Sequence, residues 1–585
     1  MPLSRLFAST FGALLLLASI VTAAAAPTRL VDQAPVKITT VAPGLVLVDF
    51  GQVAFGNIRL LPGADATGPI TVHFGEALTD GRINRKPPGT VRYATTTPTL
   101  VGGQPLIAAP AADKRNTTAP AVLTPAEWGV VLPFRWVEIE GWSGELRADQ
   151  IQRRAAFAST WNDHAASFRS SEPLFDRIWE LSRYSIKATT FAGVYVDGDR
   201  ERIAYEADAY LNQLSHYASD PDPTMTRDTF DHLIKFPTWP TEWAPHMVFM
   251  AHADWLQTGD TAWLSPRFES LKSKLLTERA REDGLLVSSE AQVKRGDIVD
   301  WPLGERDGYV FKPVNTVVNA FHLRALALMT ELARALHRDD EAAAFAARER
   351  TTRAAFQAKL FDATRGLYRD GEGTDHASLH ANLFPLAFGL VPEPQRPAVA
   401  QWLGERGMAC SVYAAQYLLE GLFENGGATT ALDLMIAPGD RSWRHMVNSG
   451  TTITWEAWDQ KYKPNQDWNH AWGAAPVNLL SRYVLGARPL TPGWNSIRLR
   501  PHTGALTFAS GKIPTPRGPV EVAWKRATTF SLTFTVPPKT TARVDLPAIG
   551  EAKVFVDGKR VNATKSGDWL LLADELTGTH TVEVR

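Results

Sequence analysis

The stretch VVNAFHLRALALMTELARALH, residues 317–337, sets apolar residues three and four positions apart along its whole length. This spacing puts them on one face of an α-helix. The same period recurs in other long segments, among them 172–190, 341–361, 412–424 and 470–484. Roughly a dozen such segments predict an all-α domain, and paired helices in that number suit six hairpins closed into an (α/α)6 barrel. A helical repeat solenoid is the alternative, although the sequence has no visible period of fixed length.

Short alternating runs flank the helical region on both sides. LVLVDF at 45–50, ITVHF at 70–74 and FRWVEIE at 134–140 read as strands, and the Pro- and Gly-rich stretch 95–125 reads as a long surface loop. Alternation returns after residue 490, with runs at 520–525 and 530–536 and a hairpin signal at 554–558. We therefore expect an N-terminal β-sandwich at 27–160, the (α/α)6 catalytic domain at 161–486 and a C-terminal β-sandwich at 487–585.

The composition argues against some classes of binding partner, and the first residues of the chain predict where the protein is located. The 585 residues include 61 Lys plus Arg against 62 Asp plus Glu, so no net field favours nucleic acid or an anionic membrane surface. Residues 1–26 combine Arg5, an apolar run and an alanine-rich end, which is typical of a signal peptide and predicts a secreted or periplasmic protein. Cys410 is the only cysteine, which excludes an internal disulfide and favours a buried structural thiol.

The first polar cluster is YVDGDRERIAYEAD, residues 195–208, which directly follows the first long helical segment. Five carboxylates lie within twelve residues, beside two Tyr and two Arg. A solvated charged loop explains such a run as well as a set of functional acids does. The adjoining apolar segment at 209–217 favours acids that sit close to packed walls.

The second cluster is GTTITWEAWD, residues 450–459, followed by WNHAWG at 468–473. Glu456 stands between Trp455 and Trp458, an arrangement that suits either a sugar subsite or an acid on a Trp-lined packing seam. Hydrolysis of a glycosidic bond needs one carboxylic acid to protonate the departing oxygen and a second carboxylate on the other face of the sugar. The two clusters supply such a pair.

Motifs for other chemistries are missing from the sequence. The histidines have no HExxH spacing, and there is no DxDxDG loop, GxSxG elbow, Walker loop or Rossmann glycine fingerprint after a strand. We therefore expect no metal and no cofactor, and a carbohydrate as the binding partner. The sequence leaves the oligomeric state open.

Together the clusters resemble the signatures of glycoside hydrolase family 78, the α-L-rhamnosidases. The family's run Asp-Cys-Pro-x-Arg-(Asp)-Glu-Arg/Lys-x-Gly-Trp-x-x-Asp is matched by Arg200-Glu201-Arg202 and Asp208, with Asp197 as the leading acid. Its second signature, Ala-Thr-Thr-x-Trp-Glu-x-Trp-Asp followed by Asn-His, is matched more closely by residues 451–459 and 469–470. In the first signature Gly198 replaces Cys-Pro with a shorter spacing, and the Gly-Trp becomes Ala-Tyr.

The resemblance implies an exo-acting, inverting hydrolase that releases terminal L-rhamnose from glycosides or oligosaccharides. Glu201 would be the general acid and Glu456 the general base. It further implies a set of residues that contact the sugar: Asp197, Arg202, Asp208, Trp455, Asp459 and His470, with the loop residues Trp239, Trp243, Trp301 and Trp443 as further aromatic candidates. The adjacent arginines would lower the pKa of Glu201, whereas a general acid needs it raised and the neighbouring carboxylates act in that direction.

Three other functions remain open at this stage. The same barrel could hydrolyse a different terminal sugar or a uronic acid. A polysaccharide lyase of this fold would abstract a proton with Tyr or His. A non-catalytic glycan-binding protein would keep the Trp residues without needing the acids, which ranks it below the enzymes.

Overall fold

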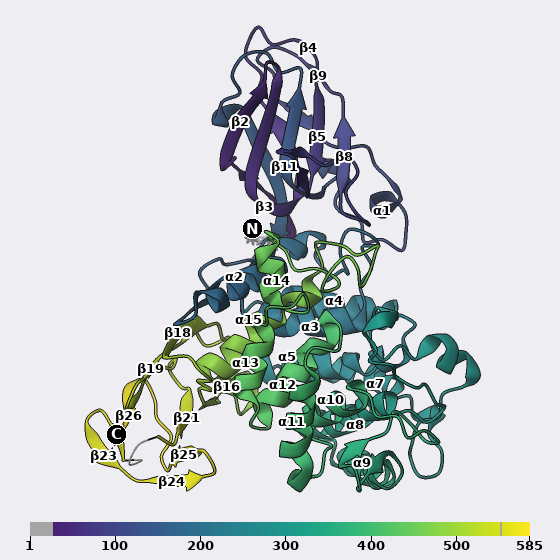
Figure 1. Cartoon of the computed structure of the whole chain (residues 1–585), viewed down its shortest axis with the longest axis vertical. Coiled ribbons are helices and arrows are strands. Elements are labelled where there is room, and N and C mark those ends of the chain that lie inside the picture. Colours follow the sequence, from purple (N-terminus) through teal and green to yellow (C-terminus); the bar gives the residue numbers. More distant parts are fainter. Residues whose placement is uncertain (1–26, 550–552) are drawn as a thin grey trace, which may run out of the picture.

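The computed structural model describes residues 27–549 and 553–585, and these form a β-rich N-terminal part, a helical centre and a β-rich C-terminal part (Figure 1). The predicted signal peptide at 1–26 lies outside the described residues. Among the helices of the described ranges, none has both the length and the apolar character that crossing a bilayer requires. The central region is helical and both flanks are built of strands, as the periodicity predicts.

The N-terminal part is built on an eight-stranded antiparallel sheet. Its strand order is β1-β12-β3-β11-β5-β8, and β2 and β10 also pair with the 16-residue strand β3. Buried residues Val48, Phe74, Phe134 and Ile139 form its core. The strands are β1 (Thr28–Gln33), β2 (Lys37–Ala42), β3 (Leu45–Leu60), β5 (Thr71–Gly75), β8 (Tyr93–Thr96), β10 (Leu106–Ala108), β11 (Leu132–Glu140) and β12 (Ile151–Ala158). Because β10 joins this sheet, the segment expected as a long loop at 95–125 is only partly irregular.

Six helices of the central part form a closed ring of contacts. Each helix touches the next, and the last touches the first again. In ring order they are α3 (Glu206–Tyr217), α5 (His246–Thr258), α8 (Thr316–Ala335), α10 (His380–Ala387), α12 (Val412–Glu424) and α15 (Ala475–Leu479). The apolar faces predicted from the sequence meet inside this ring, where Phe249, Phe321, Phe384 and Tyr417 pack ring against ring.

Further helices pack against the ring, as Figure 1 shows for α9 against α8 and for α11 beside α12. They include α2 (Pro173–Ala188), α4 (Thr224–Lys235), α9 (Asp339–Leu360), α11 (Arg396–Arg406) and α13 (Ala428–Met435), while α14 (Trp443–Asn448) packs against α2. The two acidic clusters precede two of the ring helices, α3 and α15. Both lie in the loops before these helices or in the first turn of a ring helix.

The helix predicted at 470–484 is broken into three parts. A 3₁₀ turn at Ala471–Ala474 precedes α15, and a π turn at Leu480–Leu485 follows it. Pro476 enters the first turn of α15, where its missing N–H costs no hydrogen bond. Gly473 packs so closely that a Cβ there would lie 2.8 Å from the Cβ of Thr454. The close contact of Gly473 with Thr454 thus holds the second acidic cluster against the start of α15.

The C-terminal part contains a seven-stranded and a five-stranded sheet. The larger sheet includes β18 (Phe508–Ile513), β19 (Val520–Arg526), β20 (Phe530–Thr535), β22 (Val554–Val556), β23 (Lys559–Val561) and β26 (Thr579–Val584). The predicted hairpin joins β22 to β23 through Asp557 and Gly558, both at positive φ. The edge strand β13 (Ser167–Ser170) comes from the segment before α2 and pairs with β18. One strand of this sheet therefore precedes the helical domain in the sequence, whereas the others follow it.

Candidate active site

The loop that carries Glu201 leaves α2 and folds back on itself before α3 begins. Asp197 closes this loop, because its amide donates to the carbonyl of Ile203 and its carboxylate accepts the amide of Ile203 at 3.0 Å. Gly198 has φ +136°, and a Cβ there would lie 2.8 Å from a carboxylate oxygen of Asp467. A larger side chain at this position would therefore require the loop or Asp467 to shift. Glu201 ends up with its side chain 38% exposed, at the mouth of the ring.

Glu456 lies beneath this loop and is 2% exposed. The guanidinium of Arg200 donates two hydrogen bonds to it, at 2.7 and 2.9 Å. Lys463 Nζ lies 3.1 Å from the same carboxylate, and the amide of Asp467 donates to it at 3.1 Å. These contacts compensate the charge of Glu456 and fix the direction of its carboxylate.

Arg200 also brings the two predicted catalytic acids together. Its Nε lies 3.3 Å from Glu201 Oε1 while its terminal nitrogens hold Glu456. The hydroxyl of Tyr205 donates to the other oxygen of Glu201 at 2.9 Å. The motif predicted that Arg200 lies near Glu201, but not that it also binds Glu456. Its position beside Glu201 was the signal that could have identified it.

Two buried carboxyl groups next to the acids have oxygens without a hydrogen-bond partner among the described residues. These are Oδ2 of Asp197 and Oδ1 of Asp208. Burial and the nearby charge of Glu201 raise the pKa of Asp197 well above its usual range, and burial and the charge of Glu456 do the same for Asp208. A buried oxygen without a hydrogen-bond partner lowers the stability of the fold. These two carboxyl groups are therefore suited to form hydrogen bonds with the hydroxyl groups of a polyhydroxylated ligand.

His470 completes this group from the second cluster. Its Nε2 lies 3.4 Å from Asp208 Oδ1, and its Nδ1 has no hydrogen-bond partner among the described side chains and backbone. Burial, with the charges of Arg200 and Lys463, lowers the pKa of His470 well below its usual value. The imidazole is therefore neutral near pH 7 and can donate or accept toward a sugar hydroxyl.

The predicted Trp residues differ in what they contact. Trp243 packs edge-on against Tyr205, and the ring of the half-buried Trp301 lies 5.8 Å from the Nζ of Lys463, so both border the acids. Trp455 stacks on Trp468 with ring centroids 5.5 Å apart. Trp443, in contrast, is wholly buried, and its indole donates to the carbonyl of Gly473, a packing role.

Three other predicted residues lie apart from the acids. Arg202 is fully buried, pairs with Asp199 at 2.7 Å and lies over the rings of Phe55 and Phe191, so it faces the N-terminal domain. Asp459 pairs with His445 at 2.8 Å. Trp239 is 58% exposed. No described contact of these three side chains reaches Glu201 or Glu456.

The N-terminal domain holds the active-site loops through three contacts that the sequence analysis missed. Glu76 accepts a hydrogen bond from Asn469 at 2.9 Å, Thr90 donates to Asp467, and Arg92 pairs with Asp199. Although burial would raise it, the charges of Arg92 and Arg202 lower the pKa of Asp199 to about 2. Burial and the charge of Glu456 raise the pKa of Asp467 to about 7.

Glu76 gives a prediction about pH, since burial raises its pKa to about 8 despite hydrogen bonds from Arg92 and Asn469. In the unfolded chain a Glu has a pKa of about 4.3. A raised native pKa contributes stability that is complete below the unfolded pKa and is lost as the pH rises through the native value. The free energy of unfolding of the wild type should therefore fall between about pH 4 and pH 8, by at most about 1.4 kcal/mol per pH unit from this proton.

The variant Glu76→Gln should show a shallower fall of its unfolding midpoint over that pH range. The exposed Glu145 of the same domain provides the control, and Glu145→Gln should reproduce the wild-type slope. Calorimetry at several pH values would measure both. Equal slopes for Glu76→Gln and the wild type would contradict a native Glu76 that holds its proton near neutral pH.

One group of side chains in the described residues has metal-ligand spacing. His73, Glu138 and Glu140 offer ligand atoms within 4.8 Å of one another. Glu138, however, already accepts from the guanidinium groups of Arg82 and Arg85. Its charge is thus compensated, and the trio belongs to the N-terminal sheet rather than to the acid cluster.

Comparison with known proteins identifies the family of this chain. Residues 163–484 match the bacterial alpha-L-rhamnosidase 6 hairpin glycosidase domain, residues 39–157 the concanavalin-like domain and residues 486–560 the C-terminal domain of the same enzymes. The first match covers more than half of the chain and defines its class, the six-hairpin glycosidases. Within that class the chain belongs to the bacterial α-L-rhamnosidase family, which confirms the resemblance seen in the sequence.

Individual relatives agree with this assignment. An α-L-rhamnosidase of Alteromonas sp. (strain LOR) is 25% identical over 563 residues, which cover 89% of this chain and 58% of that protein. The structure of α-L-rhamnosidase from Dictyoglumus thermophilum matches with a TM-score of 0.78 at 18% identity, over 95% of this chain and 63% of that one. The Streptomyces avermitilis α-L-rhamnosidase complexed with L-rhamnose matches with a TM-score of 0.77 at 20% identity, over 96% of this chain and 54% of that one. The chain thus spans between about half and two thirds of the length of these relatives.

Proposed function

We propose that this protein is an exo-acting, inverting α-L-rhamnosidase whose general acid is Glu201 and whose general base is Glu456. The observation that carries the assignment is the contact of both carboxyl groups with the single guanidinium of Arg200, at the mouth of the helical ring. An inverting pair stands about 6.5–9.5 Å apart, and one guanidinium between two carboxylates gives a separation of that order. We also propose that the ring and its outer helices form the (α/α)6 barrel, flanked by two β-sandwiches with the boundaries expected from the sequence.

The two acids differ in exposure in the way the two roles require. Glu201 is partly exposed and accepts a hydrogen bond from Tyr205, so it can reach the glycosidic oxygen of a substrate that enters from solvent. Glu456 is buried and held by Arg200 and Lys463, which suits a carboxylate that orients a water molecule and takes its proton. The neutral His470 and the unpaired oxygens of Asp197 and Asp208 would bind the hydroxyl groups of the terminal sugar.

A panel of aryl glycosides tests this substrate. The rate on an aryl α-L-rhamnoside should exceed the rates on the matching α-glucoside, β-galactoside and β-glucuronide by at least about 10⁴-fold, because a site with buried polar groups rejects sugars that leave those groups unpaired. Initial rates at equal substrate concentration measure the ratio. Turnover of another glycoside without turnover of the rhamnoside would assign the barrel to that other sugar.

A further inference from the structure

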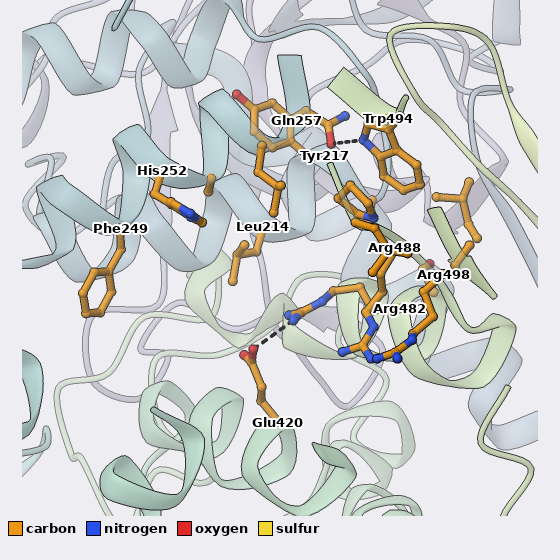
Figure 2. Close-up of a pocket in the computed structure, with 18 of the residues that line it drawn as sticks. Leu214, Tyr217, Phe249, His252, Gln257, Glu420, Arg482, Arg488, Trp494 and Arg498 are labelled. Atoms are coloured by element: carbon orange, nitrogen blue, oxygen red, sulfur yellow. Dashed lines mark hydrogen bonds and ion pairs between the residues drawn. The ribbon is translucent and has the colours of Figure 1, made fainter. Parts of the chain in front are cut away.

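A cavity lies at the end of the helical ring away from the acids (Figure 2). Asp208 stands in the first turn of α3, whereas Leu214 and Tyr217 near the other end of α3 line this cavity. The C-terminal halves of α5 and α12 and the strand β16 (Ala487–Pro489) complete its walls. Its volume of about 410 Å³ falls in the range of small-molecule sites.

Aromatic side chains line the cavity. Tyr210, Phe249 and Tyr217 come from the ring, and Trp494 comes from the C-terminal part. The indole of Trp494 donates to Gln257 at 2.8 Å, which fixes the orientation of both groups. Rigid aromatic walls of this kind bind flat apolar rings.

The cavity also carries arginines. Four arginines line the cavity against two acids: Arg324, Arg482, Arg488 and Arg498 against Glu420 and Glu424. In Figure 2 Arg482, Arg488 and Arg498 gather at one end, opposite Phe249 and His252. Arg482 pairs with Glu420 at 2.8 Å, Arg488 pairs with Glu424, and Arg498 pairs with Asp545 at 2.9 Å.

Arg324 is the one of these four arginines that remains without such a partner. It is half-buried on α8 and makes no hydrogen bond or ion pair with any residue in the described ranges. A guanidinium in this position favours an oxyanion, which it can bind with two hydrogen bonds.

Two further polar groups in the walls lack partners. Ser481 is 2% exposed and Gln257 is 6% exposed, and within the described residues neither Ser481 Oγ nor Gln257 Nε2 has a hydrogen-bond partner. Buried polar groups are normally paired, so such atoms on a cavity wall point to a ligand that supplies the missing acceptors.

We propose that this cavity binds a small aromatic carboxylate, whose oxyanion pairs with Arg324 and whose ring packs against Tyr210 and Phe249. The aromatic walls select a flat apolar body, and the guanidinium of Arg324 selects a negative group on it. The inference is independent of the reaction at the acids. Because the cavity joins the ring to the C-terminal part, the bound carboxylate should stabilise the two parts together and raise the unfolding temperature.

The test is isothermal titration of the whole protein with 4-hydroxybenzoate and with its neutral analogue 4-hydroxybenzamide. The carboxylate should bind saturably at one site, and the amide should bind at least about tenfold more weakly because it lacks the charge that arginine recognises. Arg324→Met should weaken the carboxylate by about tenfold or more, and Arg334→Met, an exposed position on the same helix, should match the wild type. Ser481→Ala removes a hydroxyl that has no partner, so it should fold normally and also bind more weakly.

Three results of this experiment would overturn the proposal. Absence of saturable binding of the carboxylate to the wild type would overturn the proposal, as would equal affinities for the carboxylate and the amide. Undiminished binding in both Arg324→Met and Ser481→Ala would place the ligand elsewhere and overturn it too. Circular dichroism and hydrolysis of the best glycoside check that each variant is folded, because neither residue contacts the acids.

Discussion

Glu456→Ala is expected to lose roughly 10²–10⁴-fold in kcat on an α-L-rhamnoside, because the variant lacks the carboxylate that deprotonates the attacking water. The neighbouring loops should stay in place, since Arg200 keeps its contact with Glu201 and Asp467 is still held by Thr90. Steady-state kinetics measure the loss. The control is Glu290→Ala, which removes an exposed carboxylate and should leave kcat unchanged.

Two further measurements identify the role of Glu456. The wild type should release a sugar of inverted anomeric configuration, which NMR detects before mutarotation. Azide needs no deprotonation, so it should restore part of the activity of Glu456→Ala and yield the inverted glycosyl azide. Retained configuration, or a sugar trapped covalently on Glu456, would instead make this residue a nucleophile.

Glu201→Gln should lose a similar roughly 10²–10⁴-fold on a rhamnoside with a poor leaving group, such as an alkyl or sugar alcohol. An activated leaving group departs with little protonation, so on a dinitrophenyl rhamnoside the loss should shrink to about tenfold. The ratio of the two losses in kcat/KM measures proton donation itself. Tyr205→Phe, which removes only the hydroxyl that donates to Glu201, should cost less on both substrates.

An equal loss on both leaving groups would contradict the assignment of Glu201 as the acid. Asp197 and Asp208 would then be the next residues to test, because burial raises the pKa of each well above its usual range.

Local pattern was enough for most of the secondary structure, since periodicity reports which face of an element is buried. The segment at 412–424 is α12 from end to end, and that at 317–337 differs from α8 by one or two residues at its ends. The segment at 470–484 is helical but not one regular α-helix: α15 is flanked by a 3₁₀ turn and a π turn, and the apolar period could not predict the tight packing of Gly473 against Thr454 in the first of these turns. The pairing of β13 with β18 could not be predicted, because it joins residues more than 300 positions apart.

The sequence predicted the candidate site as a set of motifs, but it contained no information on the contacts between them. Motif spacing indicated Glu201 and Glu456, yet it could not tell which neighbouring arginine turns inward. The structure turns Arg200 toward both acids and buries Arg202 against Asp199. The contact of Glu76 with Asn469 spans 393 positions, so no local pattern contains it.

The three contacts from Glu76, Thr90 and Arg92 to the acid-bearing loops have a consequence for protein engineering. A chimera that takes its N-terminal domain from a relative and its helical domain from this chain would lose these contacts, which hold Asp199, Asp467 and Asn469 in place. The two domains must therefore be exchanged as one cassette, or with these three positions transplanted.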